Sequence, residues 1–328
     1  MGPDMVGRPS AVKTLPGVPE LGGLYARAVL PGWPRLPGRS SGASPDHASL
    51  PDVTYRVADV VADPEQLLRY QRLLGEPADD ALPAGFVHVL AFPVAMALMI
   101  HPDFPLPLAG MVHLANAVTM SRVIRADERL EVHAWARRLA LHPRGTQVEL
   151  VTEVSARYGA GDAMEVVWRG VSTYLAKGVE RSGVTADPVD ADPVDADPVA
   201  VGAPVADAPA VFTPPMPTAR WTLDAGTGRR YAAVSGDRNP IHLSALTAKA
   251  FGFPRAIAHG MYTAARALAE SGAGRGGAFE WTVVFAKPVL LPGTVAVSIT
   301  GDDAGGFVYS GWNARSGKEH FSGTVTPT

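Results

Sequence analysis

The chain has 328 residues, 47% of them hydrophobic, so it is long for one compact domain and unlike a disordered protein in composition. Its formal net charge is −3, and no basic stripe with interleaved aromatic residues is present, which argues against a nucleic-acid partner. The chain has no cysteine, which excludes disulfides, thiolate metal sites and cysteine nucleophiles, and we expect a cytoplasmic protein.

The first fifty residues are rich in Pro, Gly and Ser, and we expect residues 1–50 to form an irregular N-terminal extension. They lack the order of basic, apolar and small residues that marks a secretory signal. The most apolar run, at residues 92–100, is much shorter than the roughly 20 residues that span a bilayer. This run predicts a buried core segment and no membrane span.

A linker is visible at residues 179–212, which are rich in Asp, Pro, Ala and Val. The tripeptide Asp-Pro-Val recurs there, beginning at Asp187, Asp192 and Asp197. Proline removes backbone donors and the acidic residues repel one another, so this segment predicts a flexible, solvated connection. It separates a front half, residues 51–178, from a back half, residues 213–328.

The two halves share an order of features. Each has a helix-like stretch with a tyrosine, followed at the same spacing by glycine and a carboxylate: Tyr70, Gly75 and Glu76 in front, and Tyr231, Gly236 and Asp237 behind. An apolar, helix-compatible segment follows in each, at 91–100 and 257–269. Strand-like runs complete the halves at 131–139, 147–156 and 165–176, and at 281–291, 294–300, 306–312 and 319–326. The pattern predicts an α+β fold of two related units.

The segment SGDRNPIH, residues 235–242, is the most informative part of the sequence. Its residue types cannot continue a helix, so we expect a rigid turn that presents Asp237 and His242 with no regular element between them. A carboxylate and an imidazole together can move a proton on and off carbon and oxygen near neutral pH. The alternative is that Asp237 caps the following helix and His242 packs at its start, but the dense motif favours chemistry.

A second segment, AIAHGM, precedes a helical run of apolar residues. We therefore expect Gly260 at a helix N-terminus, where unpaired N–H groups favour negative charge on a substrate oxygen. The alternative is that the helix start needs glycine for packing alone. His259 is a second-tier candidate, because a histidine at a helix start is more often structural.

Three segments, YAAVSGDRNPIH, GFPRAIAHGM and VFAKPVLLPGT, together resemble the signatures of the MaoC-like (R)-specific enoyl-CoA hydratases and 3-hydroxyacyl-thioester dehydratases. The resemblance implies a double hotdog, in which each of two units has a long central helix wrapped by a curved antiparallel sheet. It also implies a hydro-lyase that interconverts trans-2-enoyl and (R)-3-hydroxyacyl thioesters.

Carried over by position, the resemblance implies Asp237 and His242 as the catalytic pair. Asn239 and Ser235 are positioning candidates, the Gly260 N–H is the oxyanion donor, and Tyr231 joins His259 in the second tier. The resemblance favours Asp237 as the acid that protonates C2, which the residues alone leave open.

The front half departs from this pattern. Glu76 stands where Asp237 does, but Ala78 replaces Asn239 and Ala81 replaces His242. Without an imidazole the front half cannot run the same proton relay, so we expect it to be inactive, to complete a dimer-like sheet and to line an acyl tunnel.

The expected substrate is an acyl group carried on coenzyme A or on acyl carrier protein, with Arg255 and Lys249 as candidate carrier-binding residues. No cofactor or metal is expected, and the chain is either a monomeric pseudo-dimer or a homodimer. Two alternatives stay open: a hotdog thioesterase, and a non-catalytic acyl-thioester-binding subunit.

Overall fold

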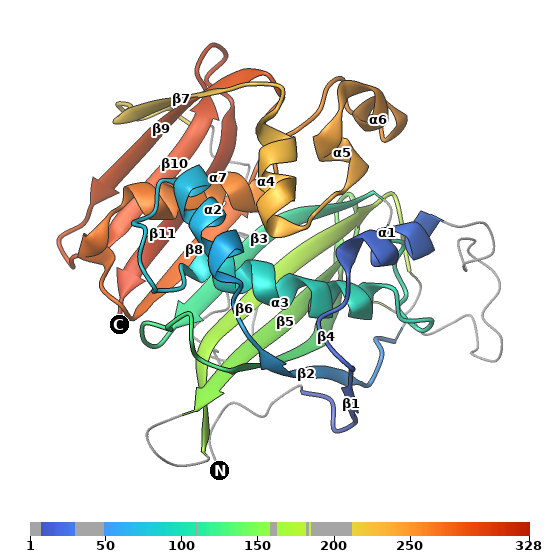
Figure 1. Cartoon of the computed structure of the whole chain (residues 1–328). Helices are drawn as coiled ribbons and strands as arrows, with labels where there is room; N and C mark the ends of the chain where they lie inside the picture. Colours follow the sequence, from blue (N-terminus) through green and yellow to red (C-terminus); the bar gives the residue numbers. More distant parts are fainter. Residues whose placement is uncertain (1–7, 30–48, 109, 158–162, 182–183, 185–211) are drawn as a thin grey trace. The chain divides into compact units, whose positions relative to one another are not determined.

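The computed structural model describes residues 8–29, 49–108, 110–157, 163–181, 184 and 212–328. The chain forms two compact units, each assembled from segments that are distant in sequence. Unit 1 comprises Met1–Val61, His88–Leu114 and Arg129–Asp190. Unit 2 comprises Ala62–Val87, Ala115–Glu128 and Ala191–Thr328. Both units combine helices with a mainly antiparallel sheet, as the sequence predicted (Figure 1).

Unit 1 is built on long strands in the order β1-β2-β4-β5-β6. Their bounds are β1 (Val12–Thr14), β2 (Thr54–Val60), β4 (Leu130–His142), β5 (Gly145–Arg157) and β6 (Met164–Lys177). Helix α3 (Ala84–Met99), of which the part from His88 onward belongs to this unit, is apolar on all sides and almost wholly buried. A helix without a polar face is stable only when it is enclosed, so α3 is a core helix.

The N-terminal extension contains regular structure that the sequence analysis did not expect. Strand β1 pairs in parallel with β2, and helix α1 (Leu21–Val29) follows it. Leu21 and Leu24 pack against Met96 and Ile100 of the α3 region. These short elements are stabilised by contacts with a sheet edge and a core helix, and such tertiary contacts leave little local pattern in a Pro- and Gly-rich sequence.

Unit 2 holds the SGDRNPIH motif. Its strands run in the order β3-β8-β11-β10-β9-β7, with bounds β3 (Met111–Met120, in this unit from Ala115), β8 (Phe279–Phe285), β11 (Glu319–Pro327), β10 (Phe307–Asn313), β9 (Gly293–Gly301) and β7 (Ala219–Leu223). Its helices are α2 (Pro64–Leu74), α4 (Thr227–Ser235), α5 (Pro240–Leu243), α6 (Ala245–Ala250) and α7 (Gly260–Glu270). Helix α7 packs on β8, and α2 contacts both α4 and α7.

Large aromatic side chains fill the core of unit 2. Trp221 stacks on Phe321, and the indole N–H of Trp281 donates to the Tyr309 hydroxyl at 2.8 Å. All four are almost fully buried, so the sheet is a rigid support for the helices on it.

Every strand-like run of the sequence analysis corresponds to a strand, whereas β2, β3 and β7 were not predicted. Residues 185–211, most of the predicted linker, lie outside the described residues. In the part of the chain that is described, no helix has both the length and the apolar character needed to cross a membrane.

Candidate active site

The turn that presents Asp237 is fixed by its own residues. Helix α4 ends at Ser235 because Gly236 adopts a left-handed φ of 74°, with its N–H bonded to the carbonyl of Ala232. The Ser235 hydroxyl accepts the N–H of Asp237 at 3.2 Å, and the carboxylate Oδ1 of Asp237 accepts the N–H of Asn239 at 3.1 Å. These two hydrogen bonds hold the backbone on both sides of Asp237, and that Ser235 and Asn239 position its carboxylate for catalysis stays a prediction.

His242 lies on a short helix, which corrects the expectation of a turn without regular structure. Helix α5 begins at Pro240, whose fixed φ suits the first helical position, and Asn239 caps it by accepting the N–H of Ile241. His242 is buried on this helix. The NPIH sequence thus forms a capped helical turn that points the imidazole inward.

Gly228 allows α5 to approach α4. A Cβ atom at this position would lie 2.1 Å from the carbonyl oxygen of His242, which is far inside van der Waals contact. The sequence analysis missed Gly228, although a glycine within a helical run signals close packing.

The tautomer of His242 follows from its hydrogen bond. Its Nδ1 lies 2.9 Å from the carbonyl oxygen of Ile257. A carbonyl only accepts, so Nδ1 carries the proton and, in the neutral ring, Nε2 is left as the acceptor. The segment that supplies this carbonyl is held by strand-like pairing, since Ala258 N–H donates to Val289 and Leu291 N–H to Ala256. The sequence analysis also missed this role of Ile257.

The imidazole of His242 is neutral at physiological pH. Burial, and then the neighbouring His259, lower its pKa to about 3, against smaller opposing effects of Asp237 and of the Ile257 hydrogen bond. A neutral ring with Nε2 as acceptor is the form that a general base requires.

His259 lies directly against the proposed catalytic pair. Its ring stacks on His242 with 3.7 Å between centroids, and its Nε2 lies 3.0 Å from the backbone carbonyl of Asp237 and 3.7 Å from that residue's carboxylate Oδ2. Burial lowers the pKa of His259 as well. Its Nδ1 is buried without a hydrogen-bond partner among the described residues. His259 therefore supports both members of the pair from one side.

Tyr231 packs behind His259, with 4.9 Å between ring centroids, and makes an edge contact with Tyr262. Burial raises the pKa of the Tyr231 phenol far above its ordinary value, so the hydroxyl stays protonated. The two second-tier residues are thus brought together with Asp237 and His242.

Helix α7 begins at Gly260, as predicted. Its first N–H groups have no partner within the helix, and no acceptor of the Gly260 N–H is found among the described residues. A Cβ on Gly260 would lie 2.9 Å from the ring of Phe285, so packing also requires glycine here. Packing and anion stabilisation are both compatible with this position.

The candidate carrier-binding residues lie on the surface. Lys249 is exposed on α6, and exposed Arg255 donates to the carbonyl of Pro292 at 3.1 Å. Neither contacts Asp237 or His242 in the described hydrogen bonds and ion pairs.

Asp237, His242 and His259 also offer ligand atoms that lie within 4.8 Å of one another, so the cluster is able to hold a divalent cation. Two of the ring nitrogens are already bonded to backbone carbonyls. That no metal takes part in the reaction stays a prediction.

Comparison with known proteins identifies the family. Residues 206–307 match the family model described as MaoC like domain. Over 276 residues, 84% of this chain and 90% of the relative, the sequence is 34% identical to 3-hydroxyacyl-thioester dehydratase X of Mycobacterium tuberculosis (strain ATCC 25618 / H37Rv). The chain belongs to the MaoC-like dehydratases.

Solved structures agree with this assignment. The crystal structure of HtdX of Mycobacterium tuberculosis matches this chain with a TM-score of 0.68 at 33% sequence identity. The match covers 84% of this chain and 100% of the HtdX chain. A MaoC-like dehydratase from Phytophthora capsici, at 18% identity, covers 84% of this chain and 95% of its own with a TM-score of 0.60. These neighbours confirm the predicted hotdog fold.

An acyl-ACP thioesterase from Bacteroides thetaiotaomicron VPI-5482 shares the fold at 11% identity, covering 83% of this chain and 96% of its own with a TM-score of 0.52. The fold alone therefore does not separate a dehydratase from a thioesterase. The residues around Asp237 must do so.

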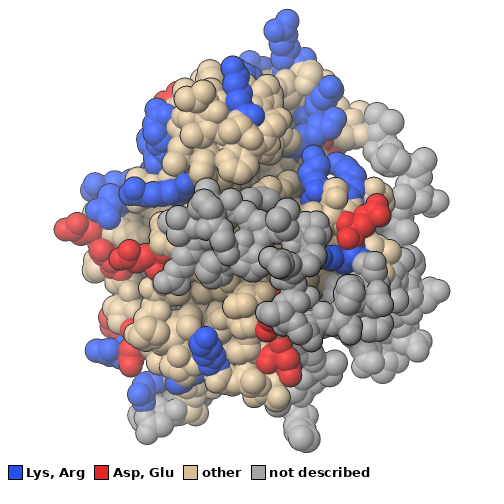
Figure 2. Space-filling view, turned by 90° about the vertical axis from the view of Figure 1, so that its right-hand side faces the viewer, with Lys and Arg blue, Asp and Glu red and all other residues tan. Residues whose placement is uncertain are grey.

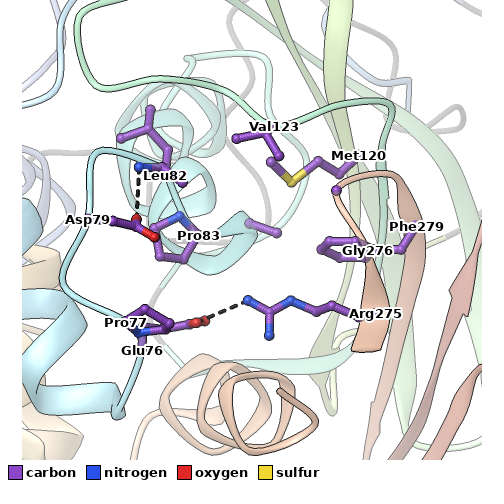
Figure 3. Close-up of a pocket in the computed structure, with 13 residues that line it drawn as sticks. Glu76, Pro77, Asp79, Leu82, Pro83, Met120, Val123, Arg275, Gly276 and Phe279 are labelled. Carbon is purple, nitrogen blue, oxygen red and sulfur yellow. Dashed lines mark hydrogen bonds and ion pairs between the residues drawn. The ribbon is translucent and has the colours of Figure 1, made fainter. Parts of the chain in front are cut away.

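The front-half counterpart of the site is a pocket without an imidazole (Figure 3). Gly75 ends α2 in the left-handed conformation, with a φ of 79°, just as Gly236 ends α4. The next residue, Glu76, is buried and forms an ion pair with Arg275 at 3.0 Å, and Ala81 lies in the same wall. The pocket has a volume of about 100 Å³. The carboxylate is thus occupied by a guanidinium, and no described side chain in this pocket is a histidine.

Proposed function

We propose that this protein is an (R)-specific 3-hydroxyacyl-thioester dehydratase that also catalyses the reverse hydration of trans-2-enoyl thioesters. The observation that carries the proposal is the neutral imidazole of His242, with Nδ1 held by Ile257 and Nε2 left as acceptor, in a cluster whose ring nitrogens and Asp237 carboxylate oxygen lie within 4.8 Å of one another. The relative from Mycobacterium tuberculosis is a 3-hydroxyacyl-thioester dehydratase, which supports the same class of activity.

In hydration, a water bonded to Asp237 and His242 loses a proton to Nε2 of His242 as its oxygen attacks C3 of the substrate. The electron pair of the double bond moves toward the thioester, and the Gly260 N–H stabilises the negative charge on the carbonyl oxygen, an effect of roughly 3–4 kcal/mol on the barrier at comparable sites. The proton taken from the water passes from His242 to the Asp237 carboxylate, and Asp237 delivers it to C2 on the same face, so that both residues return to their starting forms. Dehydration follows these steps in reverse.

The substrate in this proposal is an acyl thioester of coenzyme A or acyl carrier protein. The front half is inactive, because its carboxylate is paired with Arg275 and Ala81 replaces the imidazole. One working site per chain is compatible with a monomeric pseudo-dimer or a homodimer, and we propose a cytoplasmic location.

Reaction class is tested by mixing the full-length protein with crotonyl-CoA and following two signals. A hydratase removes the absorbance of the conjugated double bond and releases no free thiol. Release of coenzyme A without loss of the double bond would identify a thioesterase, which the shared fold keeps as the second candidate. If the absorbance stays constant and no thiol is released with enoyl thioesters of any chain length, the protein is a non-catalytic binding subunit.

A further inference from the structure

The surface around the proposed site is basic although the chain has a net charge of −3. Between Asp237 and Glu270 the sequence contains no acidic residue. Lys and Arg side chains gather on the upper part of the face in Figure 2, the side on which α5 and α6 lie in Figure 1. Four exposed basic residues lie on α4, on α6 and in the loops after these two helices, and we call them the basic face: Arg229, Arg238, Lys249 and Arg255.

The charges of the basic face are not neutralised within the described part of the chain. None of its four residues forms an ion pair there, unlike the neighbouring Arg230, which pairs with Asp224. An unpaired surface cation adds little to folding stability, whereas a cluster of them attracts an anionic partner over a distance of about a Debye length, roughly 10 Å.

An exposed apolar side chain lies on the same helix as Lys249 of the basic face. Leu246 of α6 is 81% exposed and lies three residues before Lys249, so both point from one side of the helix. Phe251, directly after α6, is also exposed. Exposed apolar side chains next to exposed cations are compatible with a protein-binding surface.

This surface is attached to the proposed catalytic residues by short contacts. The Thr247 hydroxyl of α6 donates to the carbonyl of Pro240, the first residue of the helix that bears His242. Arg229 donates to the carbonyl of Leu243, the residue after His242, and Arg238 directly follows Asp237. A partner bound here is therefore held in a fixed relation to the site.

We propose that the basic face, together with the exposed Leu246 beside Lys249, docks an acidic acyl carrier protein, and that the preferred substrate is delivered on the phosphopantetheine arm of the carrier protein. The proposal rests on the proposed function and names the carrier of that same site. Charge complementarity selects an acidic protein, and Leu246 supplies the apolar contact that such a helical partner can cover. The phosphates of a free nucleotide would bind the basic side chains but would leave Leu246 exposed to solvent.

The test compares three trans-2-octenoyl thioesters with the full-length protein: the group on a purified bacterial acyl carrier protein, on coenzyme A and on N-acetylcysteamine. The quantity to compare is the ratio of kcat/KM for the carrier-protein substrate to kcat/KM for the N-acetylcysteamine substrate. Lys249→Glu and Leu246→Ser should each lower this ratio by about tenfold or more, because KM for the carrier-protein substrate rises. Raising salt from about 50 to about 300 mM should weaken mainly the carrier-protein reaction.

The matched control is Arg72→Glu, which reverses an exposed charge on α2, away from α5 and α6 (Figure 1). Arg72→Glu should leave the ratio of the two kcat/KM values unchanged. An unchanged ratio in Lys249→Glu and Leu246→Ser would overturn the proposal. An equal loss of kcat/KM for the coenzyme A substrate would also overturn the proposal and would indicate phosphate recognition. If the variants lost only their binding to anionic phospholipid vesicles, the proposal would be overturned as well, and the surface would be a membrane-binding one.

Binding separates this proposal from the proposed function. Affinity of the fluorescently labelled carrier protein should fall about tenfold in Lys249→Glu, whether or not any thioester is turned over. If the wild-type protein binds the carrier protein but hydrates none of the three thioesters, the function is wrong and the docking surface stands. If the carrier protein binds wild type and Lys249→Glu equally, the docking surface is wrong.

Discussion

At the residue scale, the proposed chemistry depends on two imidazoles that are stacked in a buried site and are both neutral. The carbonyls of Ile257 and Asp237 fix the protonated nitrogen of His242 and His259 respectively. The sequence predicted Asp237 and His242 from their motif, and it placed His259 only in the second tier. It could not give the tautomers, because each depends on a contact between residues 15 or 22 positions apart.

Replacing His259 by Ala should lower kcat by roughly 10- to 100-fold with a smaller change in KM, because the Asp237 backbone and the His242 ring lose their support. The pKa of His242 should also rise, since the neighbouring His259 is one cause of its low value. The acid limb of kcat/KM against pH should therefore move to higher pH. Tyr262→Phe, which keeps the neighbouring ring, should move neither quantity, and an unmoved acid limb in His259→Ala would contradict the positioning role.

Gly228→Ala should destabilise the protein by about 1–3 kcal/mol, because the new Cβ must displace the His242 carbonyl and with it α5. Turnover should fall along with the melting temperature. Gly22→Ala in α1 is the matched control, since a Cβ there meets nothing within 4 Å. Equal melting temperatures for the two variants would show that α5 moves freely.

At the element scale, α7 is fixed at both ends. Its N-terminus bears Gly260, and beyond its C-terminus Arg275 donates to the carbonyls of Leu268 and Gly272 and pairs with Glu76. Helical spacing of apolar residues predicted this helix and its start. The Glu76–Arg275 pair joins residues 199 positions apart, so no local pattern could indicate it.

Glu76→Gln should lower the free energy of unfolding by about 2 kcal/mol, because it leaves the half-buried Arg275 without its counter-charge. The side chains of the pair are only 4% and 15% exposed. Glu65→Gln, which breaks the exposed pair with Arg69 on α2, should cost less than about 1 kcal/mol. Urea unfolding of both variants measures the difference, and equal losses would show that burial does not strengthen the Glu76 pair.

At the scale of the whole molecule, the alternating and apolar runs predicted the α+β class and most strands. Strands β2, β3 and β7 and the short helices α1, α5 and α6 were not predicted as regular elements. Several of them are short and stabilised by tertiary pairing, as β7 is by β9. Assembly of each unit from distant segments likewise depends on contacts that the sequence pattern does not encode.

Stability should fall as the pH falls below about 6.5. In the unfolded chain a histidine binds a proton near pH 6.5, whereas in the folded chain the pKa of His242 is about 3 and that of His259 is also lowered. Between these values the unfolded state binds more protons, so each residue lowers the free energy of unfolding by up to about 1.4 kcal/mol per pH unit. Urea unfolding between pH 7.5 and pH 5 should show a shallower pH dependence for His242→Gln than for wild type; identical slopes would contradict the buried neutral imidazole.

The central claim is that Asp237 and His242 form the acid/base pair. The most direct measurement is the rate at which wild type, Asp237→Asn and His242→Gln remove the double-bond absorbance of crotonyl-CoA, with circular dichroism confirming that each variant is folded. Each substitution should lower turnover by roughly 10²- to 10⁴-fold while the spectrum is retained. A folded Asp237→Asn or His242→Gln variant that hydrates crotonyl-CoA at nearly the wild-type rate would contradict the account.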